Sequence, residues 1–331
     1  MSVPLSILDL AIVGVGESVR DSLEGSVALA QRAEQLGYRR VWYAEHHNMS
    51  SIASSATSVL IAHVAANTRA IRLGSGGVML PNHSPLVIAE QFGTLASLHP
   101  GRIDLGLGRA PGTDQAAMAA MRRTAAASDR FPQDVLELQA LLSDRHDVDG
   151  VTATPGRGTN VPLYILGSSL FGARLAAALG LPFGFASHFA PGSLTDAVRI
   201  YRDEFRPSEQ LERPHVIAGV NVIAADSDEE AQRQFLTTKR RRVGLLLGRG
   251  RDYSDADADR ILASPQGRHL VEMARYSAVG TPEVVREYLD RFTELADADE
   301  LIVAHQASTT PERLRSIELL AEVSGLGAVP V

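Results

Sequence analysis

An acid followed by two histidines, Glu45-His46-His47, comes directly after the apolar residues 41–44. Such a group can bind a metal, transfer protons or simply begin a loop. Neighbouring residues of a strand point to opposite faces, so two adjacent imidazoles cannot easily share one metal ion while strand geometry persists. The H-x-x-H and H-E-x-x-H spacings of zinc sites do not occur. We therefore expect no metal, and at most one of the two histidines facing a cavity.

Three glycines, Gly74, Gly76 and Gly77, lie in the apolar segment 71–79, where a strand is expected. Glycine weakens a strand and often marks a bulge or the close approach of a ligand to the backbone. Crowding inside a barrel would explain the same glycines. The residues alone leave both explanations open.

Arg109 follows the apolar segment 103–107 and could place a permanent positive charge at a strand end. A guanidinium there suits a phosphate or a carboxylate. A structural salt bridge with Asp104 or Asp114 would explain Arg109 equally well. The glycines at positions 106, 108 and 112 miss the dinucleotide spacing G-x-G-x-x-G by one residue, which argues against a nicotinamide-binding fingerprint.

Gly167-Ser168-Ser169 joins an expected strand to the helical pattern 171–180. Free backbone N–H groups, serine hydroxyls and the helix dipole together favour an anion. Serine is also a common helix cap, so a purely structural role remains open. Three further histidines, His83, His188 and His305, also follow expected strands, and imidazoles at a cavity rim suit proton transfer near pH 7. We predict that His188 and His305 contact the substrate.

Short apolar segments alternate with helical patterns along the whole chain. The expected strands are 5–13, 40–44, 71–79, 103–107, 163–166, 183–186, 216–224 and 300–304. Their nearly continuous Val, Ile and Leu content is typical of buried parallel strands. The expected helices include 25–37, 84–98, 171–180, 281–295 and 310–323.

About eight strand–helix units predict an α/β fold, a (β/α)₈ TIM barrel that forms a single domain over residues 1–331. A doubly wound open sheet is the alternative. The segments 109–161, after the fourth strand, and 226–280, after the seventh, exceed the usual connection length. We expect these two insertions to form the substrate pocket.

The composition excludes several classes of protein. The chain has 331 residues, of which 45% are hydrophobic, with a net charge of −7 and no cysteine. Disulfides and thiolate chemistry are therefore excluded, and no basic surface is available for nucleic acid. The cationic run 239–242 is expected to be a solvated face or a local salt-bridge site. No segment approaches the roughly 18 apolar residues of a membrane span. The apolar N-terminus is interrupted by Asp9, so we expect no signal peptide and a cytoplasmic protein.

Three segments together carry a resemblance to a known family. They are AEHHNM, GSGGVMLPNHSPLVIAEQFGTLASLHPGRIDLGLGRAPG and LGSSLFGARLAAALGLPFGFASHF. In this order they resemble the bacterial-luciferase-like family of flavin-dependent monooxygenases, and within it the luciferase-like oxidoreductases of unassigned substrate. The resemblance implies a (β/α)₈ barrel with reduced FMN at the carboxyl ends of the strands.

The resemblance also implies roles for individual residues. Gly76 and Gly77 would lie against the isoalloxazine ring, in a strand with a strained or bulged backbone. His46 would lie near the reactive flavin carbon, with His47 beside it and Glu45 orienting a neighbour or serving the fold alone.

The phosphate-side residues follow from the same resemblance. Arg109 and the turn Gly167-Ser168-Ser169 would hold the phosphate. Ser168 replaces a glutamate of the light-emitting subunits, and Gly172 stands where some relatives carry a threonine.

The implied function is that of a monooxygenase that activates O₂ as a flavin C4a-hydroperoxide and oxidises a small organic substrate. A separate flavin reductase would supply the reduced FMN, and a homodimer is expected. Three alternatives remain: hydride transfer with a deazaflavin coenzyme, a non-catalytic flavin-binding subunit, and an unrelated barrel hydrolase that uses histidines and Asp104 with a metal.

Overall fold

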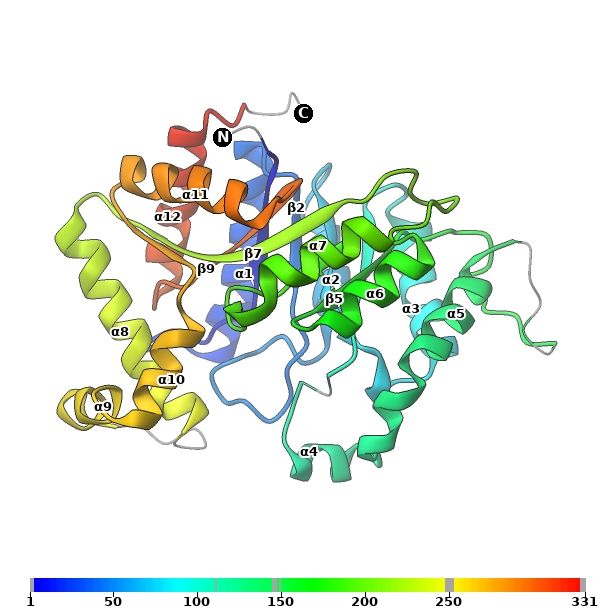
Figure 1. The fold of residues 1–331 in the computed structure, drawn as a ribbon, viewed down its shortest axis with the longest axis horizontal. Helices are drawn as coiled ribbons and strands as arrows, with labels where there is room; N and C mark the ends of the chain where they lie inside the picture. Colours follow the sequence, from blue (N-terminus) through cyan, green and yellow to red (C-terminus); the bar gives the residue numbers. More distant parts are fainter. Residues whose placement is uncertain (1–2, 111, 145–147, 149, 248–252, 328–331) are drawn as a thin grey trace.

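The computed structural model describes residues 3–110, 112–144, 148, 150–247 and 253–327, and within them nine parallel strands form one sheet (Figure 1). The strands are β1 (Leu5–Asp9), β2 (Arg40–Tyr43), β3 (Arg72–Met79), β4 (Ile103–Gly108), β5 (Leu163–Gly167), β6 (Phe183–Phe185), β7 (Val216–Ala224), β8 (Ser277–Gly280) and β9 (Glu300–His305). β6 pairs with β7, and β9 pairs with both β7 and β1, so eight of these strands close into a barrel. The predicted (β/α)₈ barrel is confirmed, and the open-sheet alternative is wrong.

Helices surround the barrel and connect its strands. They are α1 (Val19–Leu36), α2 (Thr57–Ala66), α3 (Pro85–Leu98), α4 (Gln115–Ala120), α5 (Phe131–Leu142), α6 (Leu170–Leu179), α7 (Leu194–Glu204), α8 (Asp228–Leu246), α9 (Asp255–Leu262), α10 (Pro265–Met273), α11 (Pro282–Ala296) and α12 (Thr310–Ser324). Among these helices none has the combination of length and apolarity that crossing a bilayer requires. Gly37 ends α1 in the left-handed conformation, as its position in the sequence predicts.

Two strand predictions differ from the structure. β8 was not expected, because its four residues give no recognisable pattern, and it pairs only with the last residues of β7. The first strand ends at Asp9 rather than at residue 13. There the Asp9 carboxylate accepts a hydrogen bond from the Ala11 backbone, and Ala11 has a positive φ of 47°, which turns the chain out of the sheet.

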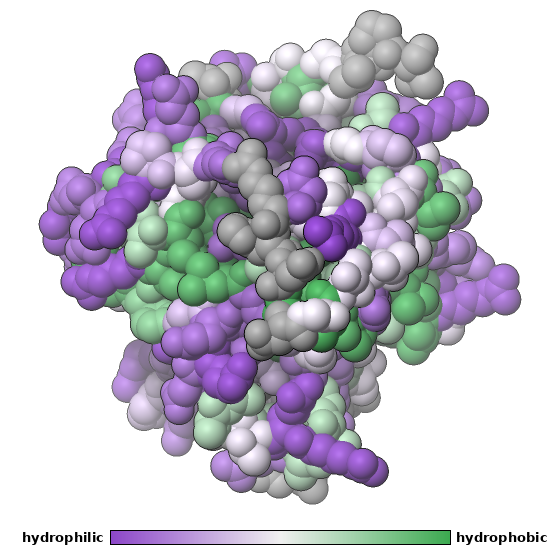
Figure 2. Space-filling model, turned by 90° about the vertical axis from the view of Figure 1, so that its right-hand side faces the viewer, coloured by the Kyte–Doolittle hydropathy of each residue, from purple (hydrophilic) through white to green (hydrophobic). Residues whose placement is uncertain are grey.

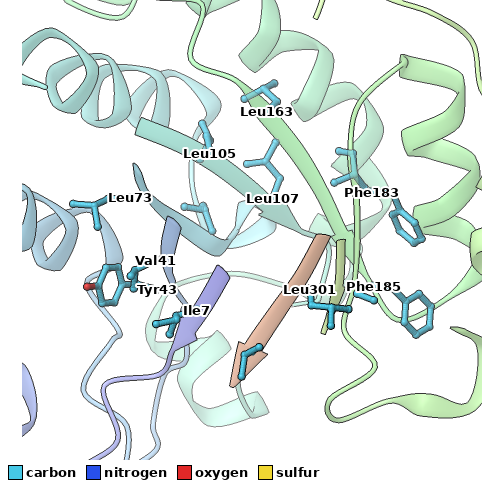
Figure 3. Close-up of a cluster of buried hydrophobic side chains, with 14 of the residues drawn as sticks. Ile7, Val41, Tyr43, Leu73, Leu105, Leu107, Leu163, Phe183, Phe185 and Leu301 are labelled. Carbon is cyan, nitrogen blue, oxygen red and sulfur yellow. The ribbon is translucent and has the colours of Figure 1, made fainter. Parts of the chain in front are cut away.

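The main hydrophobic core lies between the strands and the helices. It contains alternate residues of the strands, for example Ile7, Val41 and Leu73, and Figure 3 shows these side chains on neighbouring strands. The other face of each strand points into the barrel, where a smaller cluster contains Leu8, Trp42, Ala44, Tyr164, Ile217, Ile302 and Ala304. This alternation decides which side chains reach the barrel interior.

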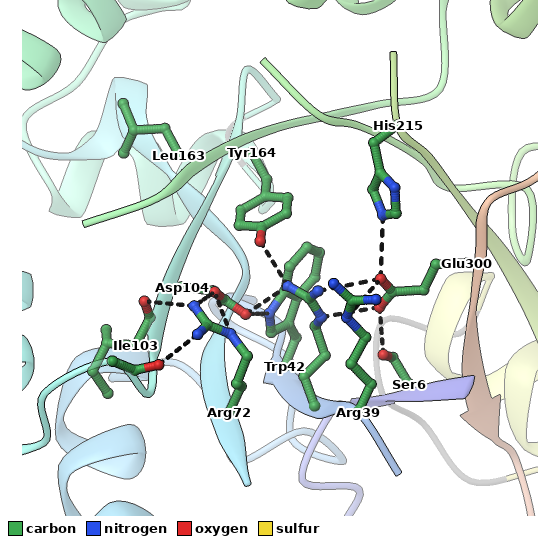
Figure 4. Close-up of polar contacts among 12 residues, drawn as sticks. Ser6, Arg39, Trp42, Arg72, Ile103, Asp104, Leu163, Tyr164, His215 and Glu300 are labelled. Atoms are coloured by element: carbon green, nitrogen blue, oxygen red, sulfur yellow. Dashed lines mark hydrogen bonds and ion pairs between the residues drawn. The ribbon is translucent and has the colours of Figure 1, made fainter. Parts of the chain in front are cut away.

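A buried charged network fills the amino-terminal end of the barrel (Figure 4). Arg40 Nη1 donates hydrogen bonds to Asp104 Oδ2 at 2.7 Å and to the Tyr164 hydroxyl at 2.8 Å, and Arg40 Nε lies 2.9 Å from Glu300 Oε1. Arg72 also pairs with Asp104, and the Ser6 hydroxyl donates to Glu300. Both carboxylates are fully buried at this end.

Helices of the two long insertions lie at the opposite end. In Figure 1 the termini lie at the top, and α4, α9 and α10 lie at the bottom, beyond the carboxyl ends of the strands. Figure 2 shows another side of the molecule, where hydrophilic side chains cover most of the outline and hydrophobic ones gather in smaller patches. These helices therefore lie at the end where barrel enzymes carry their sites.

Candidate functional site at the carboxyl-terminal mouth

Glu45, at the carboxyl end of β2, contacts three residues: His47, His83 and Met79. Its Oε1 lies 2.8 Å from His47 Nε2 and 2.8 Å from His83 Nε2, and its Oε2 accepts the Met79 backbone N–H at 3.0 Å. The carboxylate is buried, whereas the two imidazoles are half-buried. Glu45 therefore fixes the end of β2 to the segment that follows β3, and it holds two imidazoles on one oxygen.

The surroundings of Glu45 keep it ionised. Burial alone would raise its pKa, but the hydrogen bonds from His47 and His83 and the Met79 N–H lower the pKa of Glu45 to about 2. The same bond to Glu45 raises the pKa of His47. His83, which the sequence suggested only as a rim histidine, is thus a direct partner of Glu45. The sequence indicated His83 by its location after a strand, but it did not predict that Glu45 is its partner.

His46 turns away from this carboxylate network and shares the mouth with His188. Burial lowers the pKa of His46, although the Gly112 backbone and the Glu45 charge oppose that effect. Burial and the charges of Arg242 and His46 lower the pKa of His188 to about 3. Within the described part of the chain, Nδ1 of each ring is buried without a hydrogen-bond partner. Two neutral imidazoles therefore face the mouth from β2 and from the end of β6, on opposite sides of the barrel.

β3 carries an irregular backbone beside these histidines. Its register against β4 shifts between Ser75 and Val78, and the Gly76–Gly77 peptide bond is cis. The expected bulge is confirmed. A Cβ added at Gly76 would lie 2.7 Å from Leu8 Cδ1, and one at Gly77 would lie 2.7 Å from the Gly106 carbonyl oxygen. Crowding therefore requires both glycines; Gly76 stays partly exposed, whereas Gly77 is buried.

Arg109 lies at the amino-terminal end of α6. Its guanidinium carbon is 4.2 Å from the ring centroid of Phe171, in the first turn of that helix. Among the described residues Arg109 has no ion pair. Asp104, one of the two proposed partners, is occupied at the other end of the barrel, while Asp114 caps α4.

The serine turn precedes α6 directly. Ser169 is the N-cap residue of α6, but its side chain makes no capping bond, so it does not serve the structural role that serine usually has there. The turn Gly167-Ser168-Ser169 follows β5, which is adjacent to β4. The ends of β3, β4 and β5 thus bring Gly77, Arg109 and Ser169 to one mouth.

Two predicted site residues lie elsewhere than expected. His305 faces the helical layer, where its Nδ1 is 2.8 Å from the Ser316 hydroxyl of α12, so a role in substrate contact is not supported. As the last residue of β9 it lies at the rim, but the alternation of the strand turns its ring outward. Gly172 is buried against Phe183 and Gly167 and packs α6 against the sheet.

The metal-hydrolase alternative is also wrong. Asp104 lies at the amino-terminal end of the barrel, paired with Arg40 and Arg72, and far from the histidines of the mouth. Within the described residues no group of three metal-ligating side chains is suitably placed.

Comparison with known proteins gives the family. The model of the luciferase-like monooxygenases matches residues 5–299. The chain belongs to this family. It is 48% identical to a luciferase-like monooxygenase of Escherichia coli (strain K12) over 97% of both chains. It is 34% identical to an N-acetyl-S-alkylcysteine monooxygenase of Bacillus subtilis (strain 168), over 96% of this chain and 97% of the relative.

Solved structures agree with this assignment. The crystal structure of apo-MsnO8 superposes with a TM-score of 0.89 at 36% identity and covers 99% of this chain and 100% of MsnO8. The fold is also shared by an FMN complex of the oxygenating constituent of 3,6-diketocamphane monooxygenase, with a TM-score of 0.70 at 19% identity, over 100% of both chains. An F420-dependent secondary alcohol dehydrogenase has a TM-score of 0.71 at 15% identity, over 98% of this chain and 99% of that one. The homologous monooxygenases support an oxidoreductase of the monooxygenase class, and the two neighbours below 25% identity show the shared fold.

Proposed function

We propose that this protein is a monooxygenase that uses reduced FMN and O₂ to oxidise a small organic substrate, with reduced FMN delivered by a separate reductase. The observation that carries the proposal is the meeting, at one mouth, of a partly exposed glycine of β3, a cation beside a helix amino terminus, and two neutral imidazoles. When bound, the flavin supplies the activation of oxygen, and the protein supplies binding, orientation and exclusion of water.

The residues of the mouth fit such a group. Gly76 is partly exposed and has no side chain, so a flat ring can approach the backbone of β3 there, whereas Gly77 is buried against Gly106 and Leu166. Arg109, Gly167, Ser168 and Ser169 suit its phosphate, because a guanidinium, serine hydroxyls and helix N–H groups are all donors to an anion. Nδ1 of His46 and Nδ1 of His188 have no hydrogen-bond partner among the described residues, and each can donate or accept a hydrogen bond.

His46 is the residue we assign to proton handling. Its lowered pKa keeps the imidazole neutral at pH 7, so it can donate a hydrogen bond from one ring nitrogen and accept a proton at the other. Glu45 and His47 act as positioning residues, because their mutual hydrogen bond fixes the chain on either side of His46.

The phosphate assignment is tested by Arg109→Gln. We expect roughly tenfold to hundredfold weaker FMN binding, as for the loss of a charge-assisted hydrogen bond, and little change for riboflavin, which has no phosphate. Fluorescence titration of both ligands gives the two affinities. Arg174→Gln, on α6 and paired with Glu204 at the surface, is the matched control. Equal losses for FMN and riboflavin would remove Arg109 from the phosphate site.

The role of His46 is tested by His46→Ala. We expect FMN affinity to remain within about threefold, since no charge contact to the phosphate is lost, while hydrogen peroxide appears faster from reduced FMN and O₂. Stopped-flow oxygen reaction and peroxide assay measure this. His63→Ala, at an exposed position of α2, is the control. Peroxide formation at an unchanged rate would reject the role.

Binding and activity measurements identify the cofactor and the substrate. Titration with FMN and with a deazaflavin coenzyme separates oxygen activation from hydride transfer, and oxygen uptake with reduced FMN separates an enzyme from a non-catalytic flavin-binding subunit. The homodimer expected from the resemblance stays a prediction for sedimentation analysis. The relative that acts on N-acetyl-S-alkylcysteines makes thioethers the first substrates to screen.

A further inference from the structure

Three residues of the cationic run 239–242 in α8 have clear partners, and Arg242 does not. The three are Lys239, whose Nζ lies 4.6 Å from the Phe235 ring centroid, Arg240, which pairs with Asp255 and Asp259, and Arg241, which donates to the carbonyl oxygens of Val13 and Ser308. The expectation of a local salt-bridge site is therefore right for Arg240. It does not explain Arg242.

Arg242 is a half-buried cation with no counter-ion among the described residues. No carboxylate of the described residues lies within 4.0 Å of its guanidinium. Its contact is Nη2 to the neutral Asn221 Oδ1, at 3.5 Å. Burial lowers its pKa, and no acid of the described residues opposes that effect. A desolvated guanidinium held only by a long bond to an amide is costly, so its persistence needs a reason.

Asn221 is oriented so that its oxygen faces Arg242. Its Nδ2 donates to the His188 carbonyl oxygen at 2.6 Å and lies 3.3 Å from the Ser277 hydroxyl. Both amide hydrogens therefore point toward the barrel wall. The remaining group, Oδ1, is left to position the guanidinium.

Arg242 also faces the catalytic mouth. The His188 ring stands over the inward face of Gly219, where a Cβ would lie 2.5 Å from His188 Nδ1. Asn221 joins the two residues, because its Nδ2 donates to the His188 carbonyl oxygen and its Oδ1 accepts from Arg242, so Arg242 lies beside the turn that carries His188. Arg242 lies beside β7, whereas Arg109 follows β4, three strands away around the barrel.

We propose that Arg242, oriented by Asn221, binds an anionic group of the substrate, with a carboxylate as the group that matches a planar guanidinium. The substrate would supply the counter-charge that the described residues do not provide. The cofactor phosphate is served by Arg109 and the α6 terminus on the other side of the mouth, so the two cations are not redundant. This inference rests on the proposed function only in naming the ligand a substrate.

The test compares matched acids and amides on Arg242→Gln, Arg242→Lys and Lys239→Gln. Lys239→Gln removes the same charge from the same helix without touching Asn221. The probes are hexanoate with hexanamide, phenylacetate with phenylacetamide, and hexane-1-sulfonate. Ligand-observed NMR gives each affinity with and without FMN, and circular dichroism checks the fold. We expect about tenfold tighter binding of acids than amides in the wild type and in Lys239→Gln. The preference should vanish in Arg242→Gln and partly persist in Arg242→Lys.

The outcomes separate this inference from the proposed function. An acid preference that Arg242→Gln leaves intact, or no acid preference in the wild type, overturns the inference. So does Arg242→Gln weakening FMN but not riboflavin, which would assign Arg242 to the phosphate. Tighter binding of the sulfonate than of hexanoate overturns the carboxylate assignment. A wild type that binds acids through Arg242 but binds no FMN supports the anion site and rejects the proposed function.

Discussion

The two ends of the barrel use charge in opposite ways. At the amino-terminal end, Arg40 lies between Asp104 and Glu300, so the buried cation and both acids have partners of opposite sign. At the carboxyl-terminal end, Nδ1 of His46 and of His188 are buried without partners in the described chain, and Arg242 has no counter-ion there. The first arrangement satisfies itself, whereas the second is complete only with a ligand.

The difference has a physical basis in what fills each end. Large side chains, Trp42 and Tyr164 among them, pack around the charged network, and Trp42 Nε1 donates to Asp104 Oδ2 at 3.1 Å. Nearer the mouth, glycines occupy inward positions of β3 and β7, and side chains from other elements pack over them: Leu8 beside Gly76 and His188 over Gly219. Buried polar groups are normally paired, so two imidazoles with an unpartnered Nδ1, together with an arginine that has no described counter-ion, mark the carboxyl-terminal end as the functional one.

Breaking the amino-terminal network should have the largest effect. Arg40→Leu leaves Asp104 and Glu300 buried without their shared cation, so we expect the free energy of unfolding to fall by about 3–5 kcal/mol. Urea denaturation measures it. Arg39→Gln removes a half-exposed cation 3.5 Å from Glu300, and should cost at most about 1 kcal/mol. FMN affinity of the folded Arg40 variant should be unchanged. A loss below 1 kcal/mol would contradict the structural role given to this network.

Glu45 tests the paired part of the opposite end. Its pKa is lowered to about 2 from an ordinary 4.5, so its ionised form contributes stability above pH 4.5 that is lost as the pH falls toward 2. Glu45→Gln should therefore cost roughly 3 kcal/mol at pH 7, and the difference from the wild type should narrow below pH 4.5. Glu230→Gln removes an exposed carboxylate with a similarly low pKa and should change little. A difference for Glu45→Gln that stays constant down to pH 3 would sink this interpretation.

Gly77 tests the close packing of β3 against its neighbours. In Gly77→Ala the added methyl group meets the Gly106 carbonyl oxygen and Leu166 Cδ1, both at 2.7 Å, so the strands must separate. We expect a loss of about 1–3 kcal/mol in stability, together with weaker FMN binding. Gly192→Ala has open space around the new methyl group and serves as the control. Wild-type FMN affinity in the Gly77 variant would show that the ring does not lie against this strand.

His305 should give the smallest effect. Its ring bonds to Ser316 on the helical side, so His305→Asn should leave FMN affinity and peroxide formation unchanged and lower stability by about 1 kcal/mol. Flavin titration beside thermal unfolding measures both. Altered FMN binding by a folded His305→Asn protein would show that His305 belongs to the site.

The sequence predicted the barrel because its repeating apolar segments and helical patterns are local signals. The sequence also allowed the prediction that Arg109 and the serine turn lie at the same end of the barrel, because the ends of neighbouring parallel strands meet there. His305 was misplaced because one residue of strand register reverses the direction of a side chain. β8 was missed because four residues carry too little pattern.

Sequence by itself determined the fold class and the residue types available at the mouth, because hydrophobic periodicity and strand ends depend on near neighbours. Only the tertiary structure decided which charges found partners. Glu45 bonds to two imidazoles, and Asp104 pairs with two guanidiniums at the far end. Arg242 pairs with none of the described acids. Pairing depends on distances between segments far apart in the chain, and those distances exist only once the barrel has closed.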